Sequence, residues 1–517
     1  MSRCLPIACL LTVAAAGGPA AGRTYVSGPI IGDTQWTAVG GPYVVTSSVE
    51  VTAGARLTID PGVSVLFESG TQLEVVSGEL IARSGPSNPI RFRGDNDASW
   101  RGLVFGGGAR SARFDAAGTY LDGSILEYAT IEGCGYTHTQ RAVEISGSRP
   151  FIHECTIRDN EDGGIRADTA PGIRIAGNDI HGNAAAHYGG GIHLVDSPGA
   201  VVSGNELRSN HAADAGGGIW LSNCADSQIL GNRVIENTAY DAAGLWVEKS
   251  DRADIHENLC LRNVATRRTG GVHVGYCDEV CFAGNVIYDN DGGSECGGVR
   301  VKYGTGTTFE GDAILQNRAL LQGGGIEVVG AMGVVLSTDP DRPTRIQGNS
   351  SPKGIDLHVA NWFDGAYDLS SPSNVDARHV NWGTTEPATI NLRICDYYDE
   401  PSKAVAVWDP AAEPPLKGDV NDDGVVNIFD AFLFNVAWGG RIGGADYDLR
   451  ADFNIDGMIN LFDAYALTDN WGADSGSLLA APAVPEPVSG LLMLTGVPTL
   501  LAARERRRRR PREEARQ

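Results

Sequence analysis

The sequence predicts an all-β protein, a right-handed parallel β-helix of about 27 residues per coil, followed by a small α-helical calcium-binding module. Two repeats carry this prediction. Between positions 164 and 326, a glycine followed by Ile, Leu or Val recurs at intervals of roughly 27 residues, and asparagines recur at the same interval. Near the C-terminus, a segment rich in Asp and Asn occurs twice, at positions 418–430 and 451–463.

The N-terminal segment predicts export. Arg3 precedes an apolar run from Cys4 to Ala16 and small residues up to Gly22, an order typical of a secretory signal peptide over residues 1–22. The chain of 517 residues has a net charge of −23 and a pI of about 4.8. This acidity argues against nucleic acid as a partner and fits an exported protein that uses calcium.

Residues 23–410 are the predicted β-helix. In one repeat, GIHLV, AVVSGN and ELRSN are interpreted as three short strands separated by corners. Such units stack about 4.8 Å apart, so that backbone groups pair with the coil above or below. A leucine-rich repeat is disfavoured because the units lack leucine ladders and a helix. The repeated glycines are Gly164, Gly191, Gly218, Gly244, Gly271, Gly298 and Gly325.

The repeated asparagines are expected at the corners, because Asn and Gly tolerate left-handed backbone. A metal or sugar role for them is disfavoured. The calcium-binding nonapeptide of some β-helices is absent, so the coils need no metal in their core. One series is Asn178, Asn205, Asn232, Asn258 and Asn285, and the other is Asn183, Asn210, Asn237, Asn263, Asn290 and Asn317.

Both ends of this region resemble secreted β-helix proteins of the pectate-lyase-like superfamily. The segments that carry the resemblance are PYVVTSSVEVTAGARLTIDPGVSVLF (42–67), NPIRF (88–92) and WRGLVF (100–105) at the start, and VDARHVNWGTTEPATINLRICDYYDE (375–400) at the end. The resemblance covers roughly residues 24–410. It implies the fold strongly and the activity weakly, since lyases, hydrolases and adhesins share this scaffold.

The strand phase predicts an outward ladder on the glycine-initiated strands. The residue after each glycine and the one two further on are apolar and point inward, so the position between them points outward. We predict an exposed carbohydrate-binding face there, with two tryptophans as platforms for sugar rings. Alternatively, the aromatics cover a loop or the adjoining N-terminal coils. The ladder reads Arg166, His193, Trp220, Trp246, His273, Arg300 and Glu327, of which His193, Trp220, Trp246, His273 and Arg300 are the predicted binding residues.

Enzymatic activity is left open by the sequence. The next outward position of the same strands adds Asp168, Ser222, Glu248 and Lys302. In lyases of the superfamily an Arg or Lys removes the proton beside a uronic acid carboxylate. Arg300 and Lys302 could play this role beside His273.

An inverting hydrolase needs two carboxyl groups about 6.5–9.5 Å apart. Glu248 and Glu327 are three coils apart, about 14 Å by strand spacing, which is too far. Two pairs on successive coils remain possible, Asp168 with Asp196 and Asp214 with Asp241. No catalytic residue is assigned.

Eight cysteines follow the predicted signal peptide. Their spacing indicates no metal site, and their pairing cannot be read from the sequence. We expect several of them to be buried thiols. They are Cys134, Cys155, Cys224, Cys260, Cys277, Cys281, Cys296 and Cys395.

The segments GDVNDDGVVNIFD (418–430) and ADFNIDGMINLFD (451–463) have the spacing of EF-hand calcium loops, with Asp instead of Glu at position 12. Each places oxygen donors at positions 1, 3, 5, 9 and 12, and a backbone carbonyl at position 7. We therefore predict two Ca²⁺ ions. The predicted ligands are Asp419, Asn421, Asp423, Val425, Asn427 and Asp430 in the first loop, and Asp452, Asn454, Asp456, Met458, Asn460 and Asp463 in the second.

The duplicated loops, each followed by a short helix, resemble a type I dockerin over residues 417–472, flanked by linkers at 411–416 and 473–483. The resemblance implies a cohesin-type partner in a calcium-dependent surface assembly. Loop positions 10 and 11, often a small hydroxylated pair in cohesin-binding members, are here Ile428-Phe429 and Leu461-Phe462. A familiar cohesin is therefore not assumed, and a structural module that docks against its own chain is the alternative.

Residues 484–517 resemble a PEP-CTERM sorting signal. Val484, Pro485, Glu486 and Pro487 precede a predicted transmembrane segment at 488–503 and an arginine cluster. The resemblance implies cleavage by an exosortase-type enzyme, with membrane attachment before processing. A retained tail anchor is the alternative.

These observations predict an exported protein of the cell envelope or cell surface that binds or displays polysaccharide and carries a calcium-dependent assembly module. One alternative is a polysaccharide-degrading enzyme, either a lyase or an O-glycosyl hydrolase. Another is a non-catalytic adhesin or scaffold.

Overall fold

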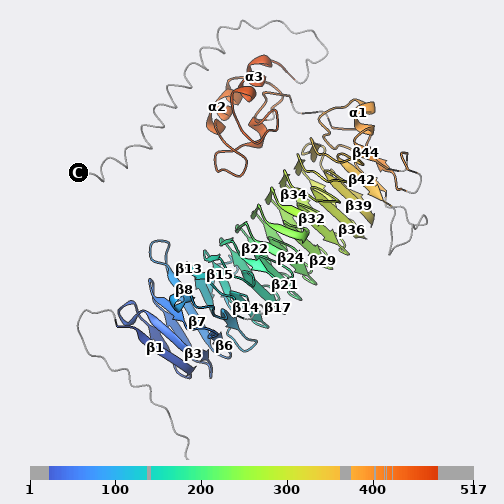
Figure 1. Cartoon of the computed structure of the whole chain (residues 1–517). Coiled ribbons are helices and arrows are strands. Elements are labelled where there is room, and N and C mark those ends of the chain that lie inside the picture. Colours follow the sequence, from blue (N-terminus) through green and yellow to red (C-terminus); the bar gives the residue numbers. More distant parts are fainter. Residues whose placement is uncertain are drawn as a thin grey trace, which may run out of the picture. The chain divides into compact units, whose positions relative to one another are not determined.

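The computed structural model describes residues 22–136, 141–360, 374–396, 398–400, 403–412, 414, 416–421 and 423–474. The chain divides into two compact units, residues 1–160 and 161–517. Both are built from coils of parallel strands, and the predicted right-handed parallel β-helix is confirmed (Figure 1). Among the described residues no helix is long and apolar enough to cross a membrane. The predicted signal peptide except Gly22, the sorting motif Val484–Pro487 and the 488–503 segment lie outside the described residues.

The first unit contains the lead-in coils, whose strands pair in parallel except for one antiparallel hairpin, β10 with β11. One set of strands comprises β1 (Thr24–Ile30), β3 (Tyr43–Val51), β5 (Ser64–Phe67), β6 (Leu73–Val75), β8 (Ile90–Gly94), β9 (Leu103–Phe105), β13 (Ala129–Glu132), β14 (Val143–Ser146) and β16 (Thr156–Arg158). The other strands are β2 (Thr34–Trp36), β4 (Arg56–Ile59), β7 (Glu79–Arg83), β10 (Arg113–Phe114), β11 (Tyr120–Asp122), β12 (Ile125–Glu127) and β15 (Phe151–His153), with short 3₁₀ turns η1 (Ala38–Gly40) and η2 (Asp95–Asp97).

In the second unit each regular coil has three strands, as the repeat predicts, and these strands form three faces. The first face consists of β17 (Ile165–Asp168), β21 (Ile192–Val195), β25 (Ile219–Ser222), β29 (Leu245–Glu248), β33 (Val272–Gly275), β36 (Val299–Thr305), β39 (Ile326–Met332), β42 (Leu357–Ala360) and β44 (Ile394–Cys395). The second face consists of β18 (Arg174–Ala176), β22 (Val201–Ser203), β26 (Gln228–Leu230), β30 (Asp254–His256), β34 (Cys281–Ala283), β37 (Thr308–Glu310), β40 (Val334–Val335), β43 (Val375–Asp376) and β45 (Ala406–Val407). The third face consists of β19 (Asp179–His181), β23 (Glu206–Arg208), β27 (Arg233–Ile235), β31 (Leu259–Leu261), β35 (Val286–Tyr288), β38 (Ala313–Leu315) and β41 (Arg345–Gln347).

The core lies inside these coils. Ile192 and Leu194 are fully buried, and the same inward pattern recurs from coil to coil, as predicted. Phe282 and Phe309 stack on adjacent coils with ring centroids 4.5 Å apart. Glycine is required before the first-face strands because the coils approach closely there: a Cβ on Gly191 would lie 2.7 Å from the carbonyl oxygen of Gly218.

The repeated asparagines form two buried ladders, but they are not themselves left-handed, which corrects the reason given for their position. Asn205 donates through Nδ2 to Oδ1 of Asn232 on the next coil (2.9 Å), and the ladder continues in this way. The left-handed backbone belongs to the residue before each asparagine, for example Glu257 (φ 55°) before Asn258. Asparagine is required because its amide offers both a donor and an acceptor to neighbouring coils.

The first ladder ends at Asp312, which stands where the repeat would place asparagine. The backbone N–H and Nδ2 of Asn285 both donate to its Oδ1 (2.8 Å each), and the N–H of Glu310 donates to Oδ2 (3.1 Å). Burial raises the pKa of Asp312 from 3.8 to about 7 despite these bonds. Stability from this group is thus fully present below about pH 4 and is lost as the pH rises through 7.

Replacing Asp312 with Asn is expected to stabilise the protein at pH 8 by about 2 kcal/mol, because the amide removes a buried charge while losing one acceptor. At pH 4 most of the gain should be lost, since the folded-state carboxyl is then protonated and carries no buried charge. Urea denaturation at both pH values measures this difference, and Asp341→Asn at an exposed carboxylate is the control. An equal gain at pH 4 and pH 8 would contradict the assigned cause.

A small four-stranded sheet, here called the arm, precedes the first-face strands in successive coils. It consists of β20 (Ala184–Ala185), β24 (His211–Ala215), β28 (Thr238–Asp241) and β32 (Val264–Arg268). Its alanines form a small buried cluster of their own, including Ala212 and Ala239. The arm and the glycine segment after it border the first face, where the predicted site residues lie.

The C-terminal module is helical, as predicted. It comprises α2 (Ile428–Ala437), the 3₁₀ turn η3 (Leu449–Ala451) and α3 (Leu461–Asp469); the short α1 (Pro387–Asn391) belongs to the closing coil. Phe434 and Leu467 pack in its core. Outside that core, Ile442 is buried against Leu261 and Tyr288 of the third face. This is the kind of contact expected if the module docks against its own chain.

Candidate functional site

Two carboxylates of the first predicted calcium loop, at positions 1 and 12, bond to the loop backbone. Asp419, at position 1, accepts a hydrogen bond from the backbone N–H of Gly424 (2.7 Å). Asp430, at position 12, reaches back across the loop and accepts from Val420 N–H (2.8 Å). Asp430 also completes a capping box with Asn427, so the last ligand position is fixed by the start of α2.

The second loop repeats this arrangement. Asp452 accepts from Gly457 N–H (2.8 Å), and Asp463 accepts from Phe453 N–H (2.9 Å). One feature differs, because the hydroxyl of Tyr447 also donates to Asp452 (2.7 Å). The two loops are therefore equivalent in backbone geometry and unequal in their surroundings.

The donors fit calcium. The pKa values of Asp419, Asp452 and Asp463 are raised, mainly by burial and further by the neighbouring carboxylates of each loop. Hydrogen bonds to these carboxylates lower the pKa values but do not cancel the increase. Clustered carboxylate, amide and carbonyl oxygens are the ligands that Ca²⁺ prefers, and its charge would offset their repulsion. The ligand assignment, including the carbonyl groups of Val425 and Met458, stays a prediction.

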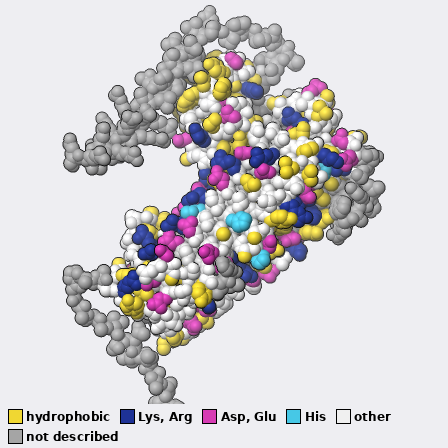
Figure 2. Space-filling view, viewed as in Figure 1, with side chains coloured by type: hydrophobic (Ala, Val, Ile, Leu, Met, Phe, Trp, Pro, Cys, Tyr) yellow, Lys and Arg dark blue, Asp and Glu magenta, His cyan; other side chains and the backbone are white. Residues whose placement is uncertain are grey.

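Both helices of the module expose apolar side chains at duplicated positions. Phe429 and Phe432 of α2 are 68% and 67% exposed, and Phe462 and Tyr465 of α3 are 70% and 56% exposed. Figure 2 shows hydrophobic side chains grouped over these helices. Exposed aromatic groups of this kind mark surfaces that bind other proteins.

The predicted outward ladder is largely buried, which corrects the expectation of an exposed face. His193, Trp220, His273 and Arg300 are each less than 10% exposed, and only Trp246 of the five is half-buried. The segment after the arm passes over them: Tyr188 stacks on Trp220 with ring centroids 5.0 Å apart. The alternative, that the aromatics pack against a loop, agrees with the contacts of Trp220 and His193 with Tyr188.

Arg300 lies in a buried ion cluster instead of facing solvent. Its Nε is 3.0 Å from Oε2 of Glu327 and its Nη1 is 2.6 Å from Oε2 of Glu295. His358, on the next coil, lies with Nδ1 3.4 Å from Oε1 of Glu327, and the ammonium of Lys403 contacts its Nε2 (2.7 Å). This cluster holds the Arg300 guanidinium between two carboxylates at the end of the ladder.

One accessible part of the first face consists of the half-buried Trp246, Glu248 and Lys302, with the buried His273 and Gly275 between them. These five residues are here called the Trp246 surface. Trp246 stacks on His273 with ring centroids 4.1 Å apart. Glu248, Gly275 and Lys302 are in register on three successive strands. A Cβ on Gly275 would lie 2.9 Å from Nε2 of His273, so the glycine leaves room for the imidazole between a carboxylate and an ammonium.

The charges of this surface are set by its burial. Burial, followed by Arg300, Lys302 and Arg268, holds the pKa of His273 well below 6.5, so its imidazole is neutral at neutral pH. Burial, and then Arg300 and Arg268, also lower the pKa of Lys302. Among the described residues neither Lys302 nor Glu248 has an ion-pair partner.

Arg268 belongs to the arm and was missed by the sequence prediction. It binds Asp241 on the neighbouring arm strand through Nη2 (2.6 Å). The two residues are one repeat apart, so their pairing could have been read from the repeat had the arm been recognised.

The carboxylate pairs considered for hydrolysis are engaged in structural contacts. Asp168 pairs with Arg166 (3.3 Å), and Asp241 with Arg268. Asp196 accepts from the Nδ2 of Asn223 (2.9 Å), and Asp214 contacts Nδ1 of His187 (2.9 Å). Each of these four carboxyl groups thus has a hydrogen-bond or ion-pair partner in the coils.

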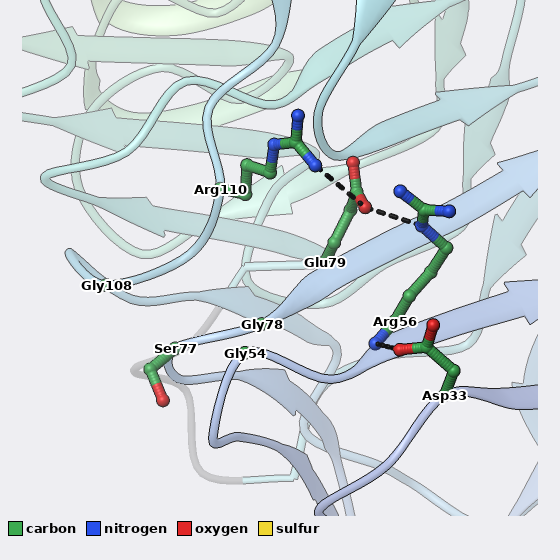
Figure 3. Close-up of a pocket in the computed structure, with 8 residues that line it drawn as sticks. All are labelled: Asp33, Gly54, Arg56, Ser77, Gly78, Glu79, Gly108 and Arg110. Carbon is green, nitrogen blue, oxygen red and sulfur yellow. Dashed lines mark hydrogen bonds and ion pairs between the residues drawn. The ribbon is translucent and has the colours of Figure 1, made fainter.

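A separate pocket of about 200 Å³ opens in the first unit (Figure 3). Two arginines converge there on the buried Glu79: Arg56 Nε lies 2.6 Å and Arg110 Nη1 3.5 Å from its Oε2. Arg110 also pairs with Asp122 (3.0 Å). Because carboxylates compensate both cations, we interpret the pocket as a structural ion cluster.

Comparisons with known proteins agree with this architecture. The family model described as "Right handed beta helix region" matches residues 110–260, and the model of the type I dockerin domain matches residues 417–470. No curated protein matches the sequence. The chain is thus a right-handed parallel β-helix protein whose small helical C-terminal region matches a dockerin.

Similar solved structures include three carbohydrate-active proteins. The periplasmic alginate epimerase AlgG is 11% identical, with 74% of this chain and 82% of that chain covered and a TM-score of 0.30. The A-module of the Azotobacter vinelandii mannuronan C-5 epimerase AlgE4 is 12% identical, with 76% and 91% covered and a TM-score of 0.29. The GH136 lacto-N-biosidase from Eubacterium ramulus is 11% identical, with 69% and 62% covered and a TM-score of 0.28. Likenesses this distant do not bear on what this chain binds.

Proposed function

We propose that this protein is exported to the cell envelope or cell surface, where the β-helix binds polysaccharide and the dockerin-like module joins a calcium-dependent assembly. The observation that carries the glycan part is the Trp246 surface. It combines a half-buried tryptophan with a carboxylate and an ammonium that lack ion-pair partners among the described residues. Sugar recognition uses such a combination, with a ring to stack on and charged groups to bond hydroxyl or carboxylate groups.

The assembly part is supported by the duplicated apolar positions on α2 and α3. Phe429 and Phe462, at position 11 of their loops, are both strongly exposed. A cohesin-type partner for this module would need an apolar surface where familiar cohesins meet hydroxyl groups. Processing by an exosortase-type enzyme at Val484–Pro487 remains part of the proposal.

Removing both charges of the Trp246 surface is expected to weaken glycan binding by about 1–3 kcal/mol, or roughly 5- to 150-fold. The variant is Glu248→Gln with Lys302→Gln, measured by calorimetry of the full chain against a polyuronate and a neutral glucan. Lys302→Gln alone should weaken binding of the polyuronate more than binding of the neutral glucan. The matched control is Glu236→Gln with Arg262→Gln, an exposed ion pair away from this surface (3.0 Å). Equal affinities of wild type and both double variants would refute the assignment.

A lyase is the second candidate, because His273 is a neutral base among cations. Such an enzyme would use Lys302 or Arg268 to neutralise a uronate carboxylate and His273 to accept the adjacent proton. Incubating the wild-type protein with the polyuronate that it binds separates the two functions. Chain shortening with new unsaturated ends, lost in His273→Asn, indicates the lyase, whereas an unchanged polymer indicates binding alone.

A further inference from the structure

Cys281 differs from every other described cysteine. The other seven are buried, whereas Cys281 is half-buried on the outer side of β34 in the second face. Asp254 on β30 is its neighbour in register on the preceding coil. His256 follows Asp254 by two positions on the same strand, so both side chains leave the strand on the same side.

The three side chains bring one sulfur, one nitrogen and one oxygen together. One potential ligand atom from each lies within 4.8 Å of the other two. The Nε2 of His256 is 3.9 Å from Oδ1 of Asp254, too far for a hydrogen bond. This Nε2 atom is buried and has no hydrogen-bond partner among the described residues. The donors therefore surround a small gap instead of bonding to one another.

The gap has the dimensions and the charge of a cation site. Metal–ligand bonds of about 2.0–2.3 Å in a tetrahedron place ligand atoms roughly 3.3–3.8 Å apart, so the side chains need to close by about 1 Å. Asp254 supplies one carboxylate to the gap, whose charge a divalent ion would offset.

We infer that Asp254, His256 and Cys281 bind one divalent transition-metal ion of the zinc class, with a fourth position open to solvent. Thiolate and imidazole donors favour such ions over calcium, which prefers oxygen alone. Three protein ligands with an open position are the arrangement of zinc sites that bind or activate a small molecule. The site is distinct from the calcium loops and from the Trp246 surface, which lies on the first face.

Cobalt is the probe that tests this site. The reduced full-length protein, with calcium in excess to occupy the two loops, is titrated with Co²⁺. One equivalent should produce a sulfur-to-cobalt charge-transfer band in the near ultraviolet together with visible bands of tetrahedral cobalt, and Zn²⁺ should displace it. The charge-transfer band reports thiolate ligation directly, so it does not depend on any activity.

Two variants and one control assign the ligands. Cys281→Ser should abolish the charge-transfer band, and His256→Gln should weaken cobalt binding by at least about 100-fold. All three side chains lie on the surface of the coil, so circular dichroism should be unchanged. His211→Gln, at an exposed histidine of the arm, should bind cobalt as wild type does. A wild-type protein without the band at stoichiometric cobalt, a Cys281→Ser variant that retains it, or a Cys281 disulfide between two chains would each overturn the inference.

Discussion

Replacing Glu327 with Ala is expected to destabilise the β-helix by about 3–5 kcal/mol, because it leaves a buried guanidinium without its main partner. Glu327 is fully buried and contacts both Arg300 and His358. Burial alone would raise its pKa, but Arg300, and then His358 and Gln322, outweigh burial and lower the pKa to about 2. Its contribution is therefore present above pH 4.5, near the unfolded-state pKa, and is lost as the pH falls through 2.

Equilibrium urea denaturation at pH 7 measures this loss. The control is Glu236→Ala, which removes the same side chain from an exposed pair with Arg262 and should cost less than about 1 kcal/mol. Both variants remove a glutamate that pairs with an arginine, one in the buried cluster and one on the surface. Similar losses in both variants would mean that the buried cluster contributes no more than a surface pair.

The second large effect concerns calcium. Each loop carries three predicted Asp ligands, and metal binding is expected to supply the free energy that holds them close. A site filled at 100 times its dissociation constant adds about 2.7 kcal/mol, so two sites add about 5 kcal/mol, a large share of the stability of a small module. The double variant Asp419→Ala with Asp452→Ala should therefore leave residues 417–472 unfolded even in calcium.

Hydrogen exchange followed by mass spectrometry tests this in the full chain. Peptides from α2 and α3 should be protected in wild type with calcium and should exchange fast after chelation, whereas the double variant should exchange fast in both conditions. Peptides from the coils serve as the internal reference. Asp469→Ala, which removes a carboxylate at the end of α3, is the matched control. Calcium-dependent protection that survives in the double variant would refute the ligand assignment.

The sequence predicted the β-helix well because the repeat carries the fold. Ile192 and its equivalents had to point inward at a period of two, and the constant repeat interval set the register between coils. The positions of the Asn ladders were predicted correctly, but the reason given for them was wrong. The left-handed residue at this corner is Glu257, not Asn258, so tolerance of left-handed backbone does not explain the asparagine. Only the contacts in the structure show that amide hydrogen bonds between coils select Asn258.

The site was predicted less completely because it depends on how the arm folds over the first face. Strand phase shows that Trp220 leaves the strand outward, but it does not show that Tyr188 covers it. Aligning the sequence on its own period would have placed Asp254 beside Cys281 and Asp241 beside Arg268. Arg300 binds Glu327, which also contacts His358 of the closing coils, and the regular repeat does not specify the position of His358.

The Asn ladders also determine where this protein tolerates changes in length. Along the ladder the spacing is 26 residues from Asn237 to Asn263 and 32 from Asn317 to Asn349, yet the amide bonds across both intervals remain intact (3.0 and 3.1 Å). The missing residue is absorbed in the arm, where the register shifts between Ala239 and Asp241. The arm beside the Trp246 surface can therefore gain or lose single residues during evolution. The ladder keeps the coils in register while the length of the arm changes.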